Sequence, residues 1–447
     1  MNLRSAAVIT ALAGTLAGSN ALATEARIQS MGGGVKLWTI EDESNVFDFP
    51  SLLSRWGNRV YIDNLQPGAL DGEQFPNGRF GFHYNLSDET VIAFIGVNSN
   101  SESRPASNGF NIAGNMVNGF STLGVSFQAS QALESAGGTT NPMDFSGDAI
   151  GNTDFRYGVM FATQLGASTR FGISLNYAAD NGDVESPADA ERDQGATLID
   201  LALGLGVDLT GSELELSAGV ELGFFDDARD EPDAGTGLPG DQLEHFTGSH
   251  FGMRLNARWT FDFFDQTKIV AYGQFAYATQ SVELSNALAP VPSGDWNGLS
   301  FMAGADLRIE PFQDVIVSPG VGFLIAQQTL EGTNTVDRDA DLFLALPFYG
   351  VGVDLKLADW IDMRFGAQQF VTALRQSTTA GGVTQTGSAS DVQTTFSWGL
   401  GLNLPVAEST VAIDLSINPQ FFVNGPHVLT GNATGPFAMN AAVRYNW

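Results

Sequence analysis

The feature that most constrains this chain is a two-residue alternation of apolar with small or polar side chains across residues 199–222. Nearly every second residue is Ile, Leu or Val, and the alternation resumes after a break at Thr210, Gly211 and Ser212. Alternate side chains of a β-strand point to opposite faces, so a period of two indicates strands. The stretch therefore predicts a β-hairpin with a short polar turn and one wholly apolar face.

The same alternation recurs along most of the chain. It predicts further strand pairs at about 77–98, 154–179, 251–280, 297–328, 341–375 and 396–417, and a last strand over the C-terminal residues. Counting back from that last strand gives sixteen strands if residues 58–63 form the first, or fourteen if the N-terminal pair lies outside the wall. Pro319 and Pro347 fall inside predicted strands, and this indicates a bulge or an interruption there.

The connections alternate between short turns and longer polar segments. The longer ones are predicted as loops at 180–194, 226–245, 284–296, 329–340, 376–390 and 422–435, together with a much longer segment at 99–153. In an antiparallel meander every second connection lies at the same end of the sheet. Short turns at one end and long loops at the other are typical of outer-membrane barrels, whose longer loops are extracellular. We expect residues 99–153 to fold over or into the mouth of the barrel.

Both ends of the chain carry features of export to the outer membrane of a Gram-negative bacterium. Residues 1–23 read as a secretory signal peptide cleaved after Ala23, with one positive charge, a small and apolar run, and small residues before the cleavage point. The last strand alternates and closes on Tyr445 and Trp447, which is similar to the C-terminal signal read by the barrel assembly machinery.

Composition narrows the fold further. The chain has no cysteine, so no disulfide framework supports it, and it has 50 acidic against 20 basic residues, which argues against nucleic acid as a partner. After the signal no stretch approaches the roughly 20 apolar residues of a membrane-spanning helix. A soluble β-sandwich would also alternate, but its wet face would carry more charge than the Gly, Ala and Ser found here. We therefore expect an all-β, transmembrane, antiparallel up-and-down β-barrel over residues 57–447.

The second face of the strands is then the lining of a lumen. It carries isolated charges that either create a transverse field at a constriction or pair with one another to hold a plug or fill a narrow lumen. The lumen-lining candidates are Arg79, Arg156, Arg254, Arg258, Arg308, Arg364, Arg444, Asp200, Asp208, Glu213, Glu215, Glu221 and Asp306.

Catalysis, a metal site and a cofactor are not predicted. The histidines at 83, 245, 250 and 427 are scattered, and no nucleophile elbow, zinc motif or phosphate loop is present. The acidic stretches near residues 180–194 and 226–233 could hold divalent cations bridging lipopolysaccharide phosphates, but they lack EF-hand spacing. Solvation of exposed loops is the favoured interpretation. The expected partners are outer-membrane lipid, lipopolysaccharide and a small-molecule solute, and the sequence specifies no oligomeric state.

The residues after the signal show a family resemblance. An Arg, a Met-Gly-Gly, an acidic pair and an Asn precede an aromatic-x-aromatic-Pro, at Arg27, Met31, Gly32, Gly33, Glu41, Asp42, Asn45 and Pro50. This pattern resembles the mature N-terminus of the long-chain fatty-acid transporter-like outer-membrane proteins. Where that family has Asn-Pro-Ala, this chain has Phe-Pro-Ser.

The resemblance implies that residues 24–56 fold into the lumen as a hatch and that hydrophobic small molecules pass. The expected function is thus an outer-membrane channel or transporter for small molecules. A general water-filled porin and a non-conducting barrel serving as a surface scaffold are the alternatives.

Overall fold

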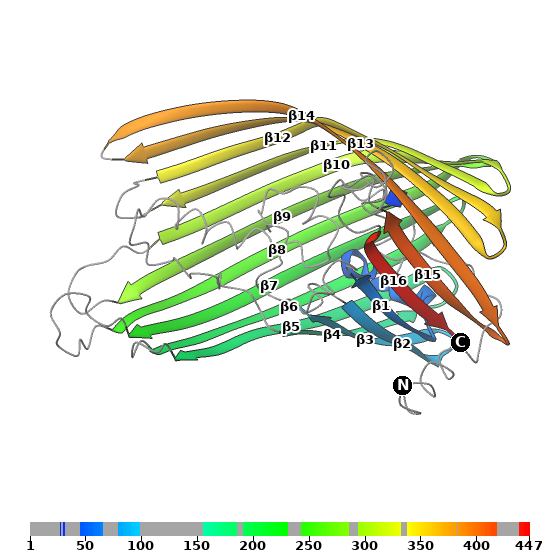
Figure 1. The fold of residues 1–447 in the computed structure, drawn as a ribbon, viewed down its shortest axis with the longest axis horizontal. Coiled ribbons are helices and arrows are strands. Elements are labelled where there is room, and N and C mark those ends of the chain that lie inside the picture. The colour runs from blue at the N-terminus through cyan, green and yellow to red at the C-terminus, as the bar shows by residue number, and fades with distance from the viewer. Residues whose placement is uncertain are drawn as a thin grey trace, which may run out of the picture.

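The sixteen-stranded barrel predicted from the alternation is confirmed. A computed structural model describes residues 27, 30–31, 45–65, 79–98, 155–185, 191–230, 243–285, 294–331, 338–380, 382–417 and 438–447. In these residues every strand pairs antiparallel with its neighbours in sequence, and the first strand pairs with the last (Figure 1). The first strand begins at Arg59, so the alternative of fourteen strands is wrong.

The strand bounds are β1 (Arg59–Leu65), β2 (Arg79–Ser87), β3 (Thr90–Asn98), β4 (Phe155–Gln164), β5 (Thr169–Glu185), β6 (Glu191–Leu209), β7 (Ser212–Asp230), β8 (Leu243–Phe264), β9 (Thr267–Ser285), β10 (Gly294–Phe312), β11 (Val315–Glu331), β12 (Arg338–Ala358), β13 (Ile361–Ala380), β14 (Val383–Val406), β15 (Ser409–Ile417) and β16 (Ala438–Asn446). Before them in the described part of the chain, Arg27, Ser30 and Met31 are helical, and they are followed by two short helices, α3 (Asn45–Asp48) and the 3₁₀ helix η1 (Pro50–Arg55).

The lengths of the connections distinguish the two ends of the barrel. Seven hairpins, from β2–β3 to β14–β15, close through two to four residues at one end, which we call the short-turn end. In the β6–β7 hairpin, Gly211 has a φ of 73°, which only glycine adopts without strain. The chain also ends here, because the Trp447 amide donates to the Asn58 carbonyl at 3.0 Å. We call the opposite end the long-loop end.

The wall is unequal in height. The strands β15, β16 and β1–β4, which we call the low wall, contain 7–10 residues, whereas β5–β14, the tall wall, contain 17–24 (Figure 1). About 9–11 tilted residues suffice to cross a membrane. β2–β4, β15 and β16 thus have the minimum spanning length and β1, with 7 residues, is shorter, whereas the tall wall continues well past this length at the long-loop end.

The outward face of the tall wall changes character along its height. Leu203, Leu255 and Phe301 lie in an apolar band and are 45%, 51% and 42% exposed. Nearer the long-loop end, outward side chains hydrogen-bond to each other, as in Ser249–Ser281 at 3.2 Å. Equivalent pairs are Tyr277–Asn297, Gln369–Thr394 and Thr379–Thr384. An apolar band bordered by a polar region is what a membrane-spanning barrel presents to lipid.

The strands run further into the predicted loops than the sequence indicates. The loop predicted at 376–390 is wrong, because β13 and β14 meet in a tight turn in which Gly382 has a φ of 75°. The loop at 180–194 is likewise wrong over most of its length, since β5 continues to Glu185 and β6 starts at Glu191. The loops at 226–245, 284–296 and 329–340 each shorten by a few residues. These strand ends are polar on both faces because they lie beyond the apolar band.

The two prolines behave differently. The register of β12 with β13 shifts between Ala345 and Phe348, next to Pro347, and both of these residues are buried although they are three apart. A β-bulge at Pro347, as predicted, explains why the inward-facing positions of β12 change from odd to even residue numbers. Pro319 pairs in register with Val351, so no bulge occurs at that position.

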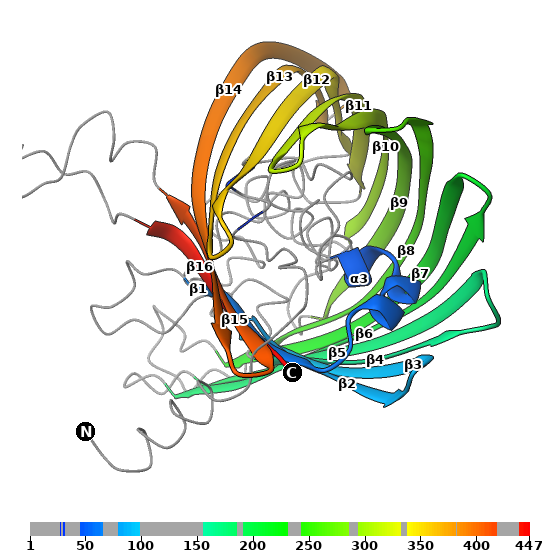
Figure 2. The same ribbon diagram turned by 90° about the vertical axis from the view of Figure 1, so that its right-hand side faces the viewer.

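The described part of the N-terminal segment lies inside the barrel. Figure 2 shows α3 and η1 within the curve of the strands, and η1 contacts β3, β4, β5 and β6. Val46, Phe49 and Leu53 are fully buried. We call residues 45–56 the luminal plug. None of the helices in the described ranges is long and apolar enough to cross a membrane.

Some predicted features lie outside the described residues. These are the signal peptide at 1–23 with its cleavage point, the glycines at 32–34, the segment at 99–153 and the loop at 422–435.

Candidate functional site in the barrel lumen

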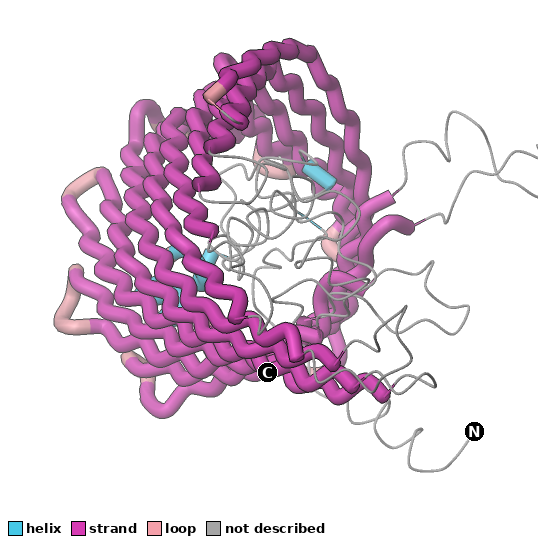
Figure 3. The backbone as a smooth tube through the Cα atoms, turned by 90° about the vertical axis from the view of Figure 1, so that its left-hand side faces the viewer, coloured by secondary structure: helices cyan, strands magenta, loops and turns pink. Residues whose placement is uncertain are grey.

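The luminal plug is attached to the wall by hydrogen bonds from both of its helices. The carbonyl of Asp48 accepts bonds from the side chains of Ser217 and Asn256, the latter at 3.3 Å. The Ser51 hydroxyl donates to Glu215 Oε2 at 2.5 Å. The end views in Figures 2 and 3 place these helices against the inner surface of the wall. The plug is therefore fixed to β7 and β8 at several points.

Glycines in the wall allow this close approach. A Cβ built at Gly204 would lie only 2.7 Å from the backbone nitrogen of Ser51 and 3.0 Å from Pro50. Gly172, on the neighbouring strand, faces the same two residues. Any larger side chain at these positions of β5 and β6 would push the plug away from the wall.

An ionic cluster holds the plug at the short-turn end, and we call it the plug cluster. Arg170 contacts Asp208 at 2.5 Å, Glu213 at 2.8 Å and Glu215 at 2.6 Å. Arg55 of the plug contacts Glu213 at 2.5 Å. The carboxylates that bind the plug are thus also in contact with Arg170. Buried charges of this kind are tolerated only when each has such a partner.

The polar contacts continue up the same wall toward the long-loop end. Arg254 binds the Asp200 carboxylate through both terminal nitrogens of its guanidinium, Nη1 at 2.8 Å and Nη2 at 2.9 Å. Asn176 donates to the same carboxylate at 2.8 Å. Next to this group, His250 Nε2 lies 2.6 Å from Glu221 Oε1. The inner face of β5–β8 is therefore polar along much of its height.

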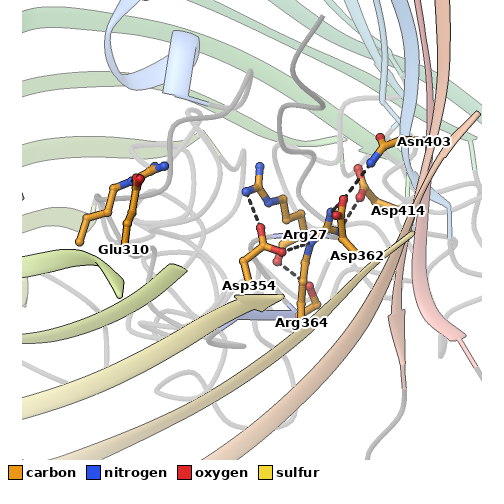
Figure 4. Close-up of polar contacts among 9 residues, drawn as sticks. Arg27, Glu310, Asp354, Asp362, Arg364, Asn403 and Asp414 are labelled. Carbon is orange, nitrogen blue, oxygen red and sulfur yellow. Dashed lines mark hydrogen bonds and ion pairs between the residues drawn. The ribbon is translucent and has the colours of Figure 1, made fainter. Parts of the chain in front are cut away.

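A second ionic cluster lies on β12–β15, and we call it the latch cluster (Figure 4). Arg27, from the segment before the plug, contacts Asp354 at 2.6 Å. Arg364 contacts Asp414 at 2.5 Å, and both Asp354 and Asp362 at 3.5 Å. A side chain at Gly401 would collide with the guanidinium of Arg364, so glycine provides its space. The N-terminal segment is thus attached to the wall in two places, at the plug and at Arg27.

Much of the remaining inner face of the barrel is apolar, although Gln274, Asp306 and Ser318 are also buried on β9–β11. On β9–β13 the buried inward side chains include those of Val270, Met302, Leu324, Phe348 and Phe370, and the rings of Phe348 and Phe370 have centroids 6.0 Å apart. They belong to one cluster with the apolar residues of the plug and of β3 and β4. An apolar lining on both sides of the plug suits contact with hydrophobic molecules.

The predicted lumen-lining residues fall into three groups. Eight of them are buried: Arg254, Arg258, Arg364, Arg444, Asp200, Glu215, Glu221 and Asp306. Asp208 and Glu213 belong to the plug cluster at the short-turn end, where Arg308 also lies, 2.8 Å from Glu310. Arg79 and Arg156 lie in β2 and β4, and the structure describes only their backbone. Arg258 reaches the plug directly, with its guanidinium 5.9 Å from the ring centre of Phe49.

Several residues of the two clusters were not predicted from the sequence. Arg170, Asp354 and Asp414 sit on strands at positions that the two-residue alternation assigns to the inner face, so that signal could have found them. Arg27 and Arg55 lie before the first strand, where no periodicity indicates a direction. In the residues that the structure describes, no group of three or more His, Asp or Glu side chains is arranged to hold a metal ion.

The strand pairing and the helices inside the barrel define a sixteen-stranded transmembrane β-barrel whose N-terminal segment contacts the inner wall. No family model matches this chain, and no curated protein matches it in sequence. A FadL homologue from Pseudomonas aeruginosa is 11% identical, with a TM-score of 0.39, over 97% of this chain and 98% of that one. A deltaS2 mutant of the TodX monoaromatic hydrocarbon channel is 11% identical, with a TM-score of 0.37, over 94% and 96%.

The ferric yersiniabactin uptake receptor FyuA from Yersinia pestis is 7% identical, with a TM-score of 0.36, over 80% of this chain and 67% of that one. All three TM-scores are below 0.5, so the fold assignment rests on the strand pairing of this chain itself.

Proposed function

We propose that this chain is an outer-membrane channel that is closed by its luminal plug and passes hydrophobic small molecules. The observation that carries the proposal is the composition of the closed lumen. The plug packs Phe49, Leu53 and Trp56 against an apolar inner wall, and charges next to it are paired. A hydrophobic solute can follow such a wall without losing its own favourable contacts, whereas a hydrated ion would lose its water.

The two attachments of the N-terminal segment support a gated channel over an open one. A general porin keeps a polar, water-filled lumen. Here the plug cluster and the latch cluster hold residues of the N-terminal segment across the lumen. Passage then requires the segment to move or to leave a path along the apolar strands.

Location in the outer membrane is part of the proposal. It is supported by the apolar outward band, by the asymmetry of the connections and by the aromatic C-terminus, where Tyr445 and Trp447 stack at 5.5 Å. These two aromatic residues are the feature that the barrel assembly machinery would read. Deleting Trp447 is expected to lower the amount of heat-resistant barrel in outer-membrane fractions. An unchanged amount would remove this part of the proposal.

The test of the channel combines conductance with uptake. The purified chain in planar bilayers should conduct little, and cells that produce it should accumulate a labelled hydrophobic solute faster than cells without it. Steady ohmic conductance would indicate a porin instead. Near-zero conductance without any uptake would indicate a scaffold. Protein that stays monodisperse without detergent would refute the membrane barrel.

Removal of the N-terminal segment tests the role of the plug. Deleting residues 24–56 is expected to raise conductance, because Arg27 of the latch cluster and Ser51 and Arg55 of the plug are then all lost. Leu53→Ser is a milder variant that keeps the chain length and loosens only the apolar packing of η1. Barrels with wild-type conductance in both variants would contradict a plug that closes the lumen.

A further inference from the structure

The inner face of the lumen changes from apolar to polar between β4 and β5. The inner face of β5–β8 carries paired charges and amides, whereas that of β3 and β4 carries the buried side chains of Val91, Ala93, Ile95, Met160 and Ala162. A solute that crosses this lumen meets both surfaces at the boundary, so the side chains there bear on which solutes fit.

Two polar residues stand on the β5 side of this boundary. Ser174 and Asn176 are two positions apart and point to the same inner face. Across β4 they pair with Met160 and Gly158, and Gly158 in turn pairs with Ile95 of β3. Met160 and Ile95 are buried and apolar. Asn176 Oδ1 lies over Gly158, since a Cβ built at that glycine would collide with this oxygen and lie 3.7 Å from Ile95 Cβ. The hydrogen-bonding groups of β5 therefore directly adjoin the apolar groups of β3 and β4.

The described residues use only part of the hydrogen-bonding capacity of Ser174 and Asn176. Asn176 donates through Nδ2 to Asp200, but its Oδ1 accepts no hydrogen bond from them, and neither does Ser174 Oγ. Both residues are at most 4% exposed. Buried polar groups are nearly always paired in native proteins, because leaving them unpaired is costly. Two free acceptors side by side indicate a position where something else supplies the donor.

We propose that Ser174 and Asn176 form a subsite for the polar head of an amphipathic solute that donates hydrogen bonds and carries no negative charge. A hydroxyl or a primary amide has this chemistry, and its apolar tail would lie on Met160 and Ile95. A carboxylate does not fit, because Asn176 Oδ1 can only accept and Asp200 lies beside it. This inference rests on the proposed function and narrows its solute class.

The experiment compares three solutes of one chain length in cells that produce the full-length protein. Radiolabelled 1-decanol, decanoate at pH 8 and decane have the same number of carbons and differ only in the head. The subsite predicts that the protein accelerates accumulation of decanol more than that of decanoate or decane. Equal acceleration of all three would overturn the subsite and leave the channel standing. No acceleration of any of them would overturn both.

Two double variants test whether Ser174 and Asn176 cause the preference for decanol. Asn176→Leu with Ser174→Ala removes both acceptors at similar volume and is expected to reduce the decanol advantage about tenfold, the effect of one or two hydrogen bonds. Gln368→Leu with Ser416→Ala is the matched control, because it removes a buried amide and a buried hydroxyl from β13 and β15. Heat-modifiable gel mobility identifies folded barrels in both. An unchanged decanol advantage in folded Asn176→Leu, Ser174→Ala protein would overturn the subsite.

Discussion

Arg27 Nη2 lies 2.6 Å from Asp354 Oδ2, although the two residues are 327 positions apart in the sequence. This ion pair joins the N-terminal segment to the far side of the wall from the plug cluster. Asp354 also faces Arg364 at 3.5 Å, so its charge keeps a partner if Arg27 leaves. The attachment at Arg27 can therefore break at a lower cost than an isolated buried pair would impose.

The Arg27–Asp354 pair is expected to stabilise the closed state. In planar bilayers Arg27→Gln and Asp354→Asn should each raise the open probability. The double variant should be less than additive, with a coupling free energy of about 0.5–3 kcal/mol. The control is Lys356→Gln with Asp359→Asn, an exposed ion pair at a short turn, which should show no coupling. Additive effects of Arg27→Gln and Asp354→Asn would show that the contact does not hold the channel closed.

Arg170 is expected to be essential for the stability of the plugged barrel. It forms ion pairs with Asp208, Glu213 and Glu215, so Arg170→Met leaves clustered carboxylates without their main partner. We expect a loss of about 3–5 kcal/mol in the free energy of unfolding by urea in lipid vesicles. Arg308→Met, which removes a partly exposed pair with Glu310, should cost only about 0–1 kcal/mol. Similar losses in the two variants would contradict the role given to the plug cluster.

The contact between Gly204 and the plug provides a steric test. Gly204→Val places methyl groups where Pro50 and Ser51 now lie and is expected to raise conductance by displacing the plug. Gly273→Val is the matched control on β9, because the nearest atom to its Cβ is a backbone oxygen at 3.8 Å. It should conduct like the wild type. A Gly204→Val barrel that stays as closed as the wild type would mean that the plug does not set the conductance.

The loss of stability caused by a charge on the outward face should depend on where along the height of the barrel the charge is placed. Leu203 lies in the apolar band, so Leu203→Arg is expected to cost about 2–4 kcal/mol of unfolding free energy in lipid vesicles. Thr329 lies on the outward face of β11 beyond the band, where it pairs with Asn297, and Thr329→Arg should cost about 0–1 kcal/mol. Equal costs would place the membrane at a different height on the tall wall.

Strand number and side-chain direction could be read from the sequence because both follow from a period of two. Alternation assigns Asp200, Arg254 and Arg364 to the inner face, and the structure buries all three. Their partners could not be read in the same way. Arg170 meets Glu213 and Glu215 only because β5, β6 and β7 pair in one particular register, which alternation alone does not specify.

Two failures of the sequence interpretation have clear physical causes. The sequence predicts a loop around Gly382 because the strands on either side of it carry Thr, Ser and Gln on both faces, as strands beyond the apolar band do. The contacts of Arg27 and Arg55 have no periodic signal at all, because the segment before β1 forms only short helices in its described part. Such contacts are specified by the shape of the lumen and not by local sequence.

The difference in strand length has a mechanical consequence. β1 and β16 join the two ends of the wall through one of its shortest ladders, whereas β13 and β14 pair residue by residue from Ile361–Leu402 to Ala380–Val383. The ladder between β1 and β16 also carries a register shift between Ile62 and Leu65. Fewer backbone bonds resist opening there than anywhere along the tall wall. Under tension or heat the cylinder would thus unzip first around β1, at its short ladders with β16 and β2, and the amides of β1 would exchange with solvent before those of the tall wall.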